Sequence, residues 1–226
     1  MDLGVSKNVE PLLAAVRNFM AEEIAPVEQE YLQEIGVGDR WQFTDRQTEI
    51  METLKDKAKS KGLWNFFLTE GDHGSGLNTV EYAYLAEEMG KSHIAAEVFN
   101  CSAPDTGNME VLHKYGSEAQ KARWLQPLLN GEIRSAYAMT EPGVASSDAT
   151  NICTEAVLDG DEWVINGNKT FITNGGMAGF YSVMCQTDSE CKPSNRGISL
   201  IMVEAEREGL TDTDVGEKMG IHIMAM

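Results

Sequence analysis

The residues best suited to chemistry lie together in one short loop, residues 138–151, which reads Ala-Met-Thr-Glu-Pro-Gly-Val-Ala-Ser-Ser-Asp-Ala-Thr-Asn. The loop combines small side chains with several hydroxyl groups. Backbone N–H groups in such a loop stay accessible, which suits a flat, phosphate-bearing ligand lying against the backbone. The alternative interpretation is a plain connector between a helix and a sheet. In that case Pro142-Gly143 is a turn, and Ser146, Ser147 and Asp148 cap the segment that follows.

Charge and composition argue against several other kinds of site. The chain has 226 residues and a formal net charge of -18, spread along its length, which makes nucleic acid an unlikely partner. Neither the four cysteines nor the four histidines have the spacing of metal ligands, so we expect no metal site. No apolar run approaches the ~20 residues of a membrane span, and we expect none. The first residues carry no targeting signal, which favours the cytoplasm, with mitochondria and peroxisomes as alternatives.

Before residue 131, apolar residues recur at helical spacing. The first stripe runs from Leu12 to Ile24, and we expect Pro26 to kink or end that helix. A second helix should follow Thr44, because Gln47 lies three residues later as in a capping box. Further helices are expected over residues 79–89, over 95–115 with breaks at Pro104 and Gly107, and over 117–129 with Ser117 as the N-cap.

After residue 131 the pattern changes to short runs typical of strands, expected at 154–158, 162–165, 169–173, 180–186 and 198–203. Asp159-Gly160-Asp161 and Asn166-Gly167 are interpreted as the hairpin turns that join the first three. The fold class is therefore α+β. We expect an N-terminal all-helical domain over residues 1–132 and an antiparallel, β-barrel-like domain over residues 133–226 that is incomplete.

Two blocks of this chain resemble a known family. Residues 137–151 are similar to the signature of the acyl-CoA dehydrogenases, in which a Thr-Glu-Pro-Gly core leads to a Ser-Asp pair. Residues 166–176, Asn-Gly-Asn-Lys-Thr-Phe-Ile-Thr-Asn-Gly-Gly, resemble the second flavin segment of that family, and the two blocks start about 30 residues apart in both. The resemblance implies FAD as the cofactor, in a cleft between the β domain and the helices, and acyl-CoA as the substrate.

The resemblance also implies roles for individual residues. Those expected to contact the cofactor are Tyr137, Met139, Thr140, Ser146, Ser147, Phe171, Ile172 and Thr173. The family usually has tryptophan where Phe171 stands, so the aromatic face is kept while an indole N–H is lost. One serine should also contact the substrate thioester. Counting forward from Thr140 selects Ser146, and counting back from Asp148 selects Ser147, so both remain candidates.

No residue of this chain matches the catalytic base of the family, a glutamate in a C-terminal helical bundle. Glu141 lies beside a proline, and we expect it to have a structural role that pairs a cation. The sequence therefore predicts a truncated FAD-dependent acyl-CoA dehydrogenase, an enzyme of fatty acid β-oxidation that desaturates acyl-CoA thioesters. The alternatives are a catalytically inactive flavin and acyl-CoA binding protein of the same fold, or a flavin monooxygenase. The resemblance further implies electron-transfer flavoprotein or oxygen as the electron acceptor, and a homo-oligomer.

Overall fold

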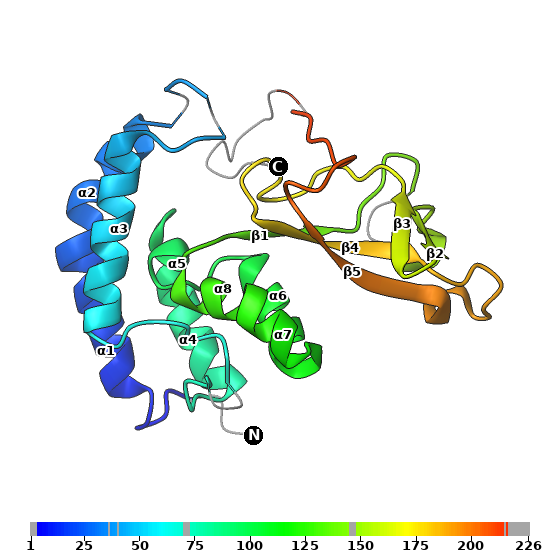
Figure 1. The fold of residues 1–226 in the computed structure, drawn as a ribbon. Coiled ribbons are helices and arrows are strands. Elements are labelled where there is room, and N and C mark those ends of the chain that lie inside the picture. The colour runs from blue at the N-terminus through cyan, green and yellow to red at the C-terminus, as the bar shows by residue number, and fades with distance from the viewer. Residues whose placement is uncertain are drawn as a thin grey trace. The chain divides into compact units, whose positions relative to one another are not determined.

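The computed structural model describes residues 4–35, 37–39, 41–69, 73–144, 148–214 and 216 (Figure 1). The chain divides into two compact units, Met1–Gly131 and Glu132–Met226. The first unit is helical and the second is built on a sheet. This confirms the expected fold class, a helical domain followed by a β domain.

The first unit consists of helices joined by loops. Their bounds are α1 Glu10–Phe19, α2 Ala25–Gln33, α3 Asp45–Ser60, α4 Thr79–Met89, α5 Ala95–Val98, α6 Asp105–Tyr115, α7 Glu118–Gln120 and α8 Gln126–Asn130, with π-helical turns η1 Met20–Ile24 and η2 Lys121–Leu125. Buried aromatic rings form part of its core. The Phe99 ring lies 5.3 Å from that of Phe19 and 5.7 Å from that of Phe66, centroid to centroid.

Each of these π-helical turns ends two residues before a proline, at Ile24 before Pro26 and at Leu125 before Pro127. The helix does not end at Pro26, because η1 leads straight into α2, and η2 leads in the same way into α8, where Pro127 is the second residue. Proline lacks an N–H and its ring crowds the carbonyl four residues earlier. A widened i→i+5 turn just before it relieves both problems, so the helical path continues past each proline.

Helix starts follow the local sequence closely. The Thr44 hydroxyl accepts a hydrogen bond from the Gln47 N–H, and the Thr44 N–H donates to the Gln47 side-chain oxygen, which confirms the capping box of α3. Ser117 caps α7 in the same way. The expected break at Pro104 is present, since α5 ends at Val98 and α6 begins after Pro104. Gly107 causes no break, because it lies inside α6.

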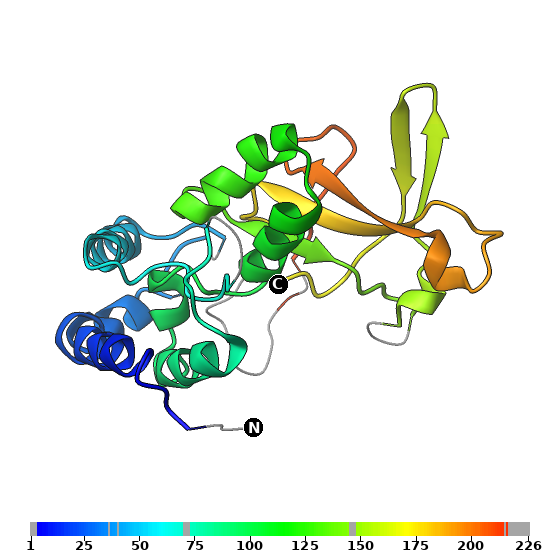
Figure 2. The ribbon, with the colours of Figure 1, turned by 90° about the horizontal axis from the view of Figure 1, so that it is seen from below.

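The second unit holds one mixed, open sheet in which β4 is the central strand (Figure 2). Its strands are β1 Ser135–Ala138, β2 Glu155–Asp159, β3 Glu162–Asn166, β4 Phe180–Gln186 and β5 Ile198–Glu204, with 3-10 turns η3 Ala149–Asn151 and η4 Ser194–Gly197. β5 pairs antiparallel with all of β4, and β2 with β3 as a hairpin. β1, however, runs parallel to β4. The long path from β1 through the hairpin to β4 makes this parallel crossover feasible.

Two local expectations in this unit are wrong. Residues 169–173 form a loop, not a strand, and Asn166-Gly167 therefore ends β3 without a hairpin turn. The reason is backbone geometry: Phe171 and Asn174 have φ values of 57° and 65°, in the left-handed region that no strand residue adopts.

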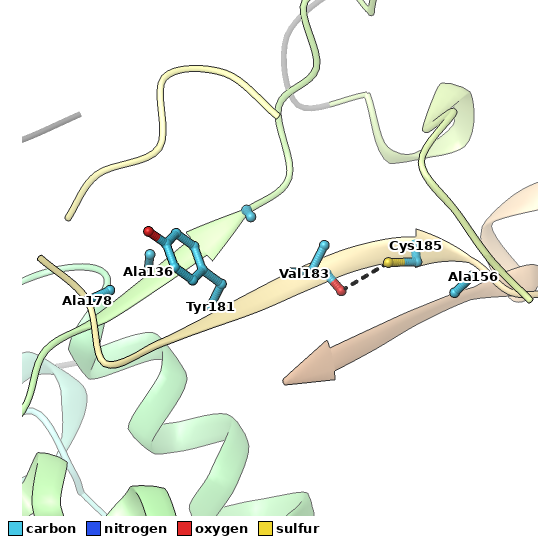
Figure 3. Packing of buried hydrophobic residues seen from close by; sticks show 7 residues of the cluster. Ala136, Ala156, Ala178, Tyr181, Val183 and Cys185 are labelled. Atoms are coloured by element: carbon cyan, nitrogen blue, oxygen red, sulfur yellow. Dashed lines mark hydrogen bonds between the residues drawn. The ribbon is translucent and has the colours of Figure 1, made fainter. Parts of the chain in front are cut away.

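The core of the second unit lies along β1 and β4. It consists of Ala136, Ala138, Ala156, Ala178, Tyr181, Val183 and Cys185. The Tyr181 ring lies beside Ala136 and Ala178 (Figure 3). The β1 side chains beside it are small and leave room for the ring. The ring thereby packs the start of β4 against β1.

Candidate cofactor site

The first candidate loop begins where β1 ends. Ala136 and Ala138 are buried, and strand alternation turns the Tyr137 side chain to the opposite face, where it is 38% exposed. The Tyr137 hydroxyl donates a hydrogen bond to the Met184 sulfur at 2.8 Å, which fixes the direction of the ring. Met139 and Thr140 follow directly and are half-buried.

The second candidate loop carries Phe171, Ile172 and Thr173. The Phe171 side chain is 59% exposed, while Ile172 and Thr173 are half-buried. Behind them, the buried Asn174 donates from its side-chain amide to the Ser135 carbonyl at 2.9 Å. The Ala178 N–H donates to the Asn174 carbonyl, closing a tight turn. An aromatic side chain thus stands in solvent on a firmly anchored loop.

The two loops are joined directly. The Thr170 N–H donates to the Thr140 carbonyl at 2.9 Å. The Lys169 ammonium donates to the Met139 carbonyl at 3.1 Å and to the Glu141 carboxylate at 2.8 Å. The structure therefore brings Met139 and Thr140 next to the segment that bears Phe171. Ser146 and Ser147 lie outside the described residues.

Glu141 is a buried anchor. Besides Lys169, its carboxylate accepts hydrogen bonds from the Cys153 N–H, and from the N–H and hydroxyl of Thr154. Burial alone raises the pKa of Glu141, but these donors, Lys169 foremost, outweigh it and lower that pKa to about 2. The carboxylate stays ionised and its oxygens are occupied, so Glu141 is unsuited to accept a proton. The expected role, structural and paired with a cation, is confirmed.

Lys169, Thr154 and Gly167 build this anchor, but the sequence did not predict them as part of a site, and Gly167 was interpreted instead as part of a hairpin turn. A Cβ on Gly167 would lie only 2.6 Å from the Thr154 Cβ, so the glycine allows the strand end to approach Thr154. The sequence feature that could have indicated the anchor is a lysine two residues after the Asn166-Gly167 pair. Its partner Glu141, 28 residues earlier, was not visible from spacing.

Asp148 has the capping role that the connector interpretation assigned to it. It accepts hydrogen bonds from the N–H and hydroxyl of Thr150 and from the Asn151 side chain. The Thr150 hydroxyl, more than any other group, lowers the pKa of Asp148. These hydrogen bonds cap η3, and the Ser194 hydroxyl also donates to the Thr150 carbonyl. The loop is thus an ordered connector that also carries Thr140.

Within the described ranges, His, Cys, Asp and Glu do not cluster in groups of three or more that could hold a metal ion. Among the described helices, none is both long and apolar enough to cross a membrane.

Comparisons with known proteins agree with this geometry. The acyl-CoA dehydrogenase N-terminal domain matches residues 6–132, and the acyl-CoA dehydrogenase middle domain matches residues 136–226. A mouse protein, acyl-CoA dehydrogenase family member 10, is 43% identical over 217 residues, which cover 92% of this chain and 20% of that protein.

Solved structures give the same answer. A protein from Mycobacterium abscessus assigned as an acyl-CoA dehydrogenase has a TM-score of 0.83 and 44% identity, covering 92% of this chain and 53% of its own. A glutaryl-CoA dehydrogenase from Mycobacterium smegmatis in complex with FADH2 has a TM-score of 0.73 and 25% identity, covering 98% and 51%. The chain thus spans about half the length of these solved relatives and a fifth of the mouse protein. It belongs to the acyl-CoA dehydrogenase family.

Proposed function

We propose that this chain serves in an FAD-dependent acyl-CoA dehydrogenase, which desaturates acyl-CoA thioesters at the α,β position, and that its second unit holds the flavin. The observation that carries the proposal is the junction of the two loops. The bond from Thr170 to the Thr140 carbonyl, with that from Lys169 to the Met139 carbonyl, joins the two family blocks to each other, which supports a shared site.

The residues present fit a flavin. Tyr137 and Phe171 offer exposed aromatic faces to a flat ring, and apolar cover on such a ring is favourable. Thr140 and Thr173 are half-buried and carry hydroxyl groups suited to the polar edge of the ring. Phe171 also keeps a φ of 57°, a conformation that costs a bulky residue roughly 1–3 kcal/mol and that tends to occur at ligand sites.

The roles of the residues follow from this arrangement. A bound flavin would supply a hydride acceptor for the substrate carbon β to the thioester. Thr140 and Thr173 would hold and polarise the polar edge of the ring. Tyr137 and Phe171 would exclude water from it, and Met139 and Ile172 would add apolar contact. Ser146 or Ser147 contacts the cofactor or the thioester. The α-proton would be removed by a base that we assign to none of the described residues, and electron-transfer flavoprotein or oxygen is the proposed electron acceptor.

The test is an absorbance spectrum of the purified chain after incubation with FAD and gel filtration. The wild-type chain should retain a flavin band shifted from that of free FAD. Phe171→Ala should weaken FAD binding about tenfold, which corresponds to ~1.4 kcal/mol for a lost aromatic contact. Trp163→Ala is the matched control, since Trp163 is 46% exposed on the β2–β3 hairpin and should leave affinity unchanged. A folded wild-type chain that retains no flavin would refute the proposal.

A second measurement separates dehydrogenase from binding protein. Anaerobic addition of acyl-CoA should bleach the flavin band if the chain supports the reaction. A retained flavin whose band stays oxidised with acyl-CoA would favour the catalytically inactive flavin and acyl-CoA binding protein.

A further inference from the structure

The buried Tyr181 links the second loop to a distant part of the chain. Its side chain is 5% exposed on β4, with the ring beside Ala136 and Ala178 (Figure 3). Its hydroxyl oxygen lies 2.8 Å from each carboxylate oxygen of Asp212 and accepts a hydrogen bond from the Gly176 N–H at 3.2 Å. Asp212 belongs to the segment after β5, so residues 36 positions apart meet at one phenol.

The direction of these hydrogen bonds is fixed by protonation. The pKa of Tyr181 is raised to about 12. Burial is the main cause, the Gly176 N–H opposes it, and Asp212 adds to the rise. The phenol therefore keeps its proton at neutral pH. A carboxylate is an acceptor only, so the phenol donates to Asp212 and its lone pair faces Gly176. A hydroxyl that donates to an anion becomes a better acceptor, which strengthens the bond from Gly176.

This bond completes the anchoring of the loop that bears Phe171, Ile172 and Thr173. Thr170 fixes its start through the Thr140 carbonyl, and Asn174 fixes its middle through the Ser135 carbonyl. Gly176 fixes its end, and Tyr181 is the group that holds Gly176. With Gly176 released, the loop would keep its start and the turn closed by Ala178 and Asn174, but it would lose the bond that ties Gly176 to β4.

We propose that Tyr181 and Asp212 together position the Phe171–Thr173 segment, and so set the affinity for flavin without touching it. The consequence for flavin rests on the proposed function. The anchoring of the loop itself does not, because it concerns contacts within this chain alone. Asp212 acts on the loop only through Tyr181, because it orients the phenol proton away from Gly176.

The test compares three variants by NMR amide exchange without flavin and by FAD titration. Tyr181→Phe should speed exchange of the Gly176 amide at least tenfold and raise the Kd for FAD about fivefold to tenfold. Asp212→Asn, whose amide oxygen still accepts from the phenol, should give a smaller change in both. Ser182→Ala is the control for losing a buried hydroxyl from the same strand, since the Ser182 hydroxyl donates to the Met202 sulfur at 3.1 Å.

Each outcome decides a separate point. Unchanged Gly176 exchange in Tyr181→Phe, or an equal change in Ser182→Ala, overturns the anchoring role. Faster exchange with an unchanged Kd overturns the effect on flavin while the anchor stands. A wild-type chain that binds no FAD refutes the proposed function instead, and amide exchange alone then decides whether the pair anchors the loop.

Discussion

The sharpest prediction concerns the buried pair of Glu141 and Lys169. Their side chains are 6% and 10% exposed, and their charged atoms lie 2.8 Å apart. Glu141→Gln keeps the shape of the side chain but removes its charge, leaving the Lys169 ammonium buried without its counter-ion. We expect the second unit to lose stability at pH 7, because removal of one partner of a buried pair typically costs about 3–5 kcal/mol.

The pKa of Glu141 gives an independent magnitude. Each pKa unit is worth about 1.4 kcal/mol, so a fall from 4.5 to about 2 stabilises the folded, ionised form by about 3 kcal/mol. Because the folded-state pKa is the lower one, this contribution is fully present above the unfolded value of 4.5 and is lost as pH falls towards 2. The same linkage leaves about 1.4 kcal/mol at pH 3.

The assay is urea unfolding at pH 7 and pH 3, followed by hydrogen exchange on peptides from residues 153–186. These peptides report the second unit, so unfolding of the helical unit does not mask the effect. Glu155→Gln is the control, because Glu155 is exposed on the neighbouring β2 and should change stability by less than ~0.5 kcal/mol at pH 7. The reasoning is refuted if Glu141→Gln costs under about 1 kcal/mol at pH 7, or costs the same at pH 3.

Two further substitutions test local contacts. Gly167→Ala should lower the stability of the second unit by about 1–3 kcal/mol, since its Cβ would stand 2.6 Å from the Cβ of the buried Thr154. Thermal denaturation measures this loss, and the control Gly143→Ala, with open space around it, should melt like wild type. Thr44→Ala should cost about 1 kcal/mol of stability by removing the N-cap of α3. The control Thr48→Ala, on the exposed face of that helix, should be neutral or slightly stabilising. Equal effects of the two substitutions in urea unfolding would contradict the capping argument.

Helices could be predicted because their determinants lie close together in sequence. Thr44 and Gln47 are three residues apart, so the capping box of α3 is visible in the chain itself. The strand β1 was missed for the opposite reason. Ser-Ala-Tyr-Ala has little strand propensity, and its partner β4 begins more than 40 residues later. Its pairing, and so its direction, depends on contacts that no local pattern encodes.

The candidate site shows the same contrast within one loop. Residues 169–173 combine threonines, an aromatic ring and isoleucine, a composition that favours a strand. Three tertiary bonds override it: from Lys169 to Glu141, from Thr170 to the Thr140 carbonyl, and from Asn174 to the Ser135 carbonyl. These bonds hold the backbone where Phe171 must adopt a positive φ, and the exposed ring follows from that geometry. The misassigned segment is thus the one that the proposed function requires to be irregular, since a regular strand would return the Phe171 backbone to an extended conformation.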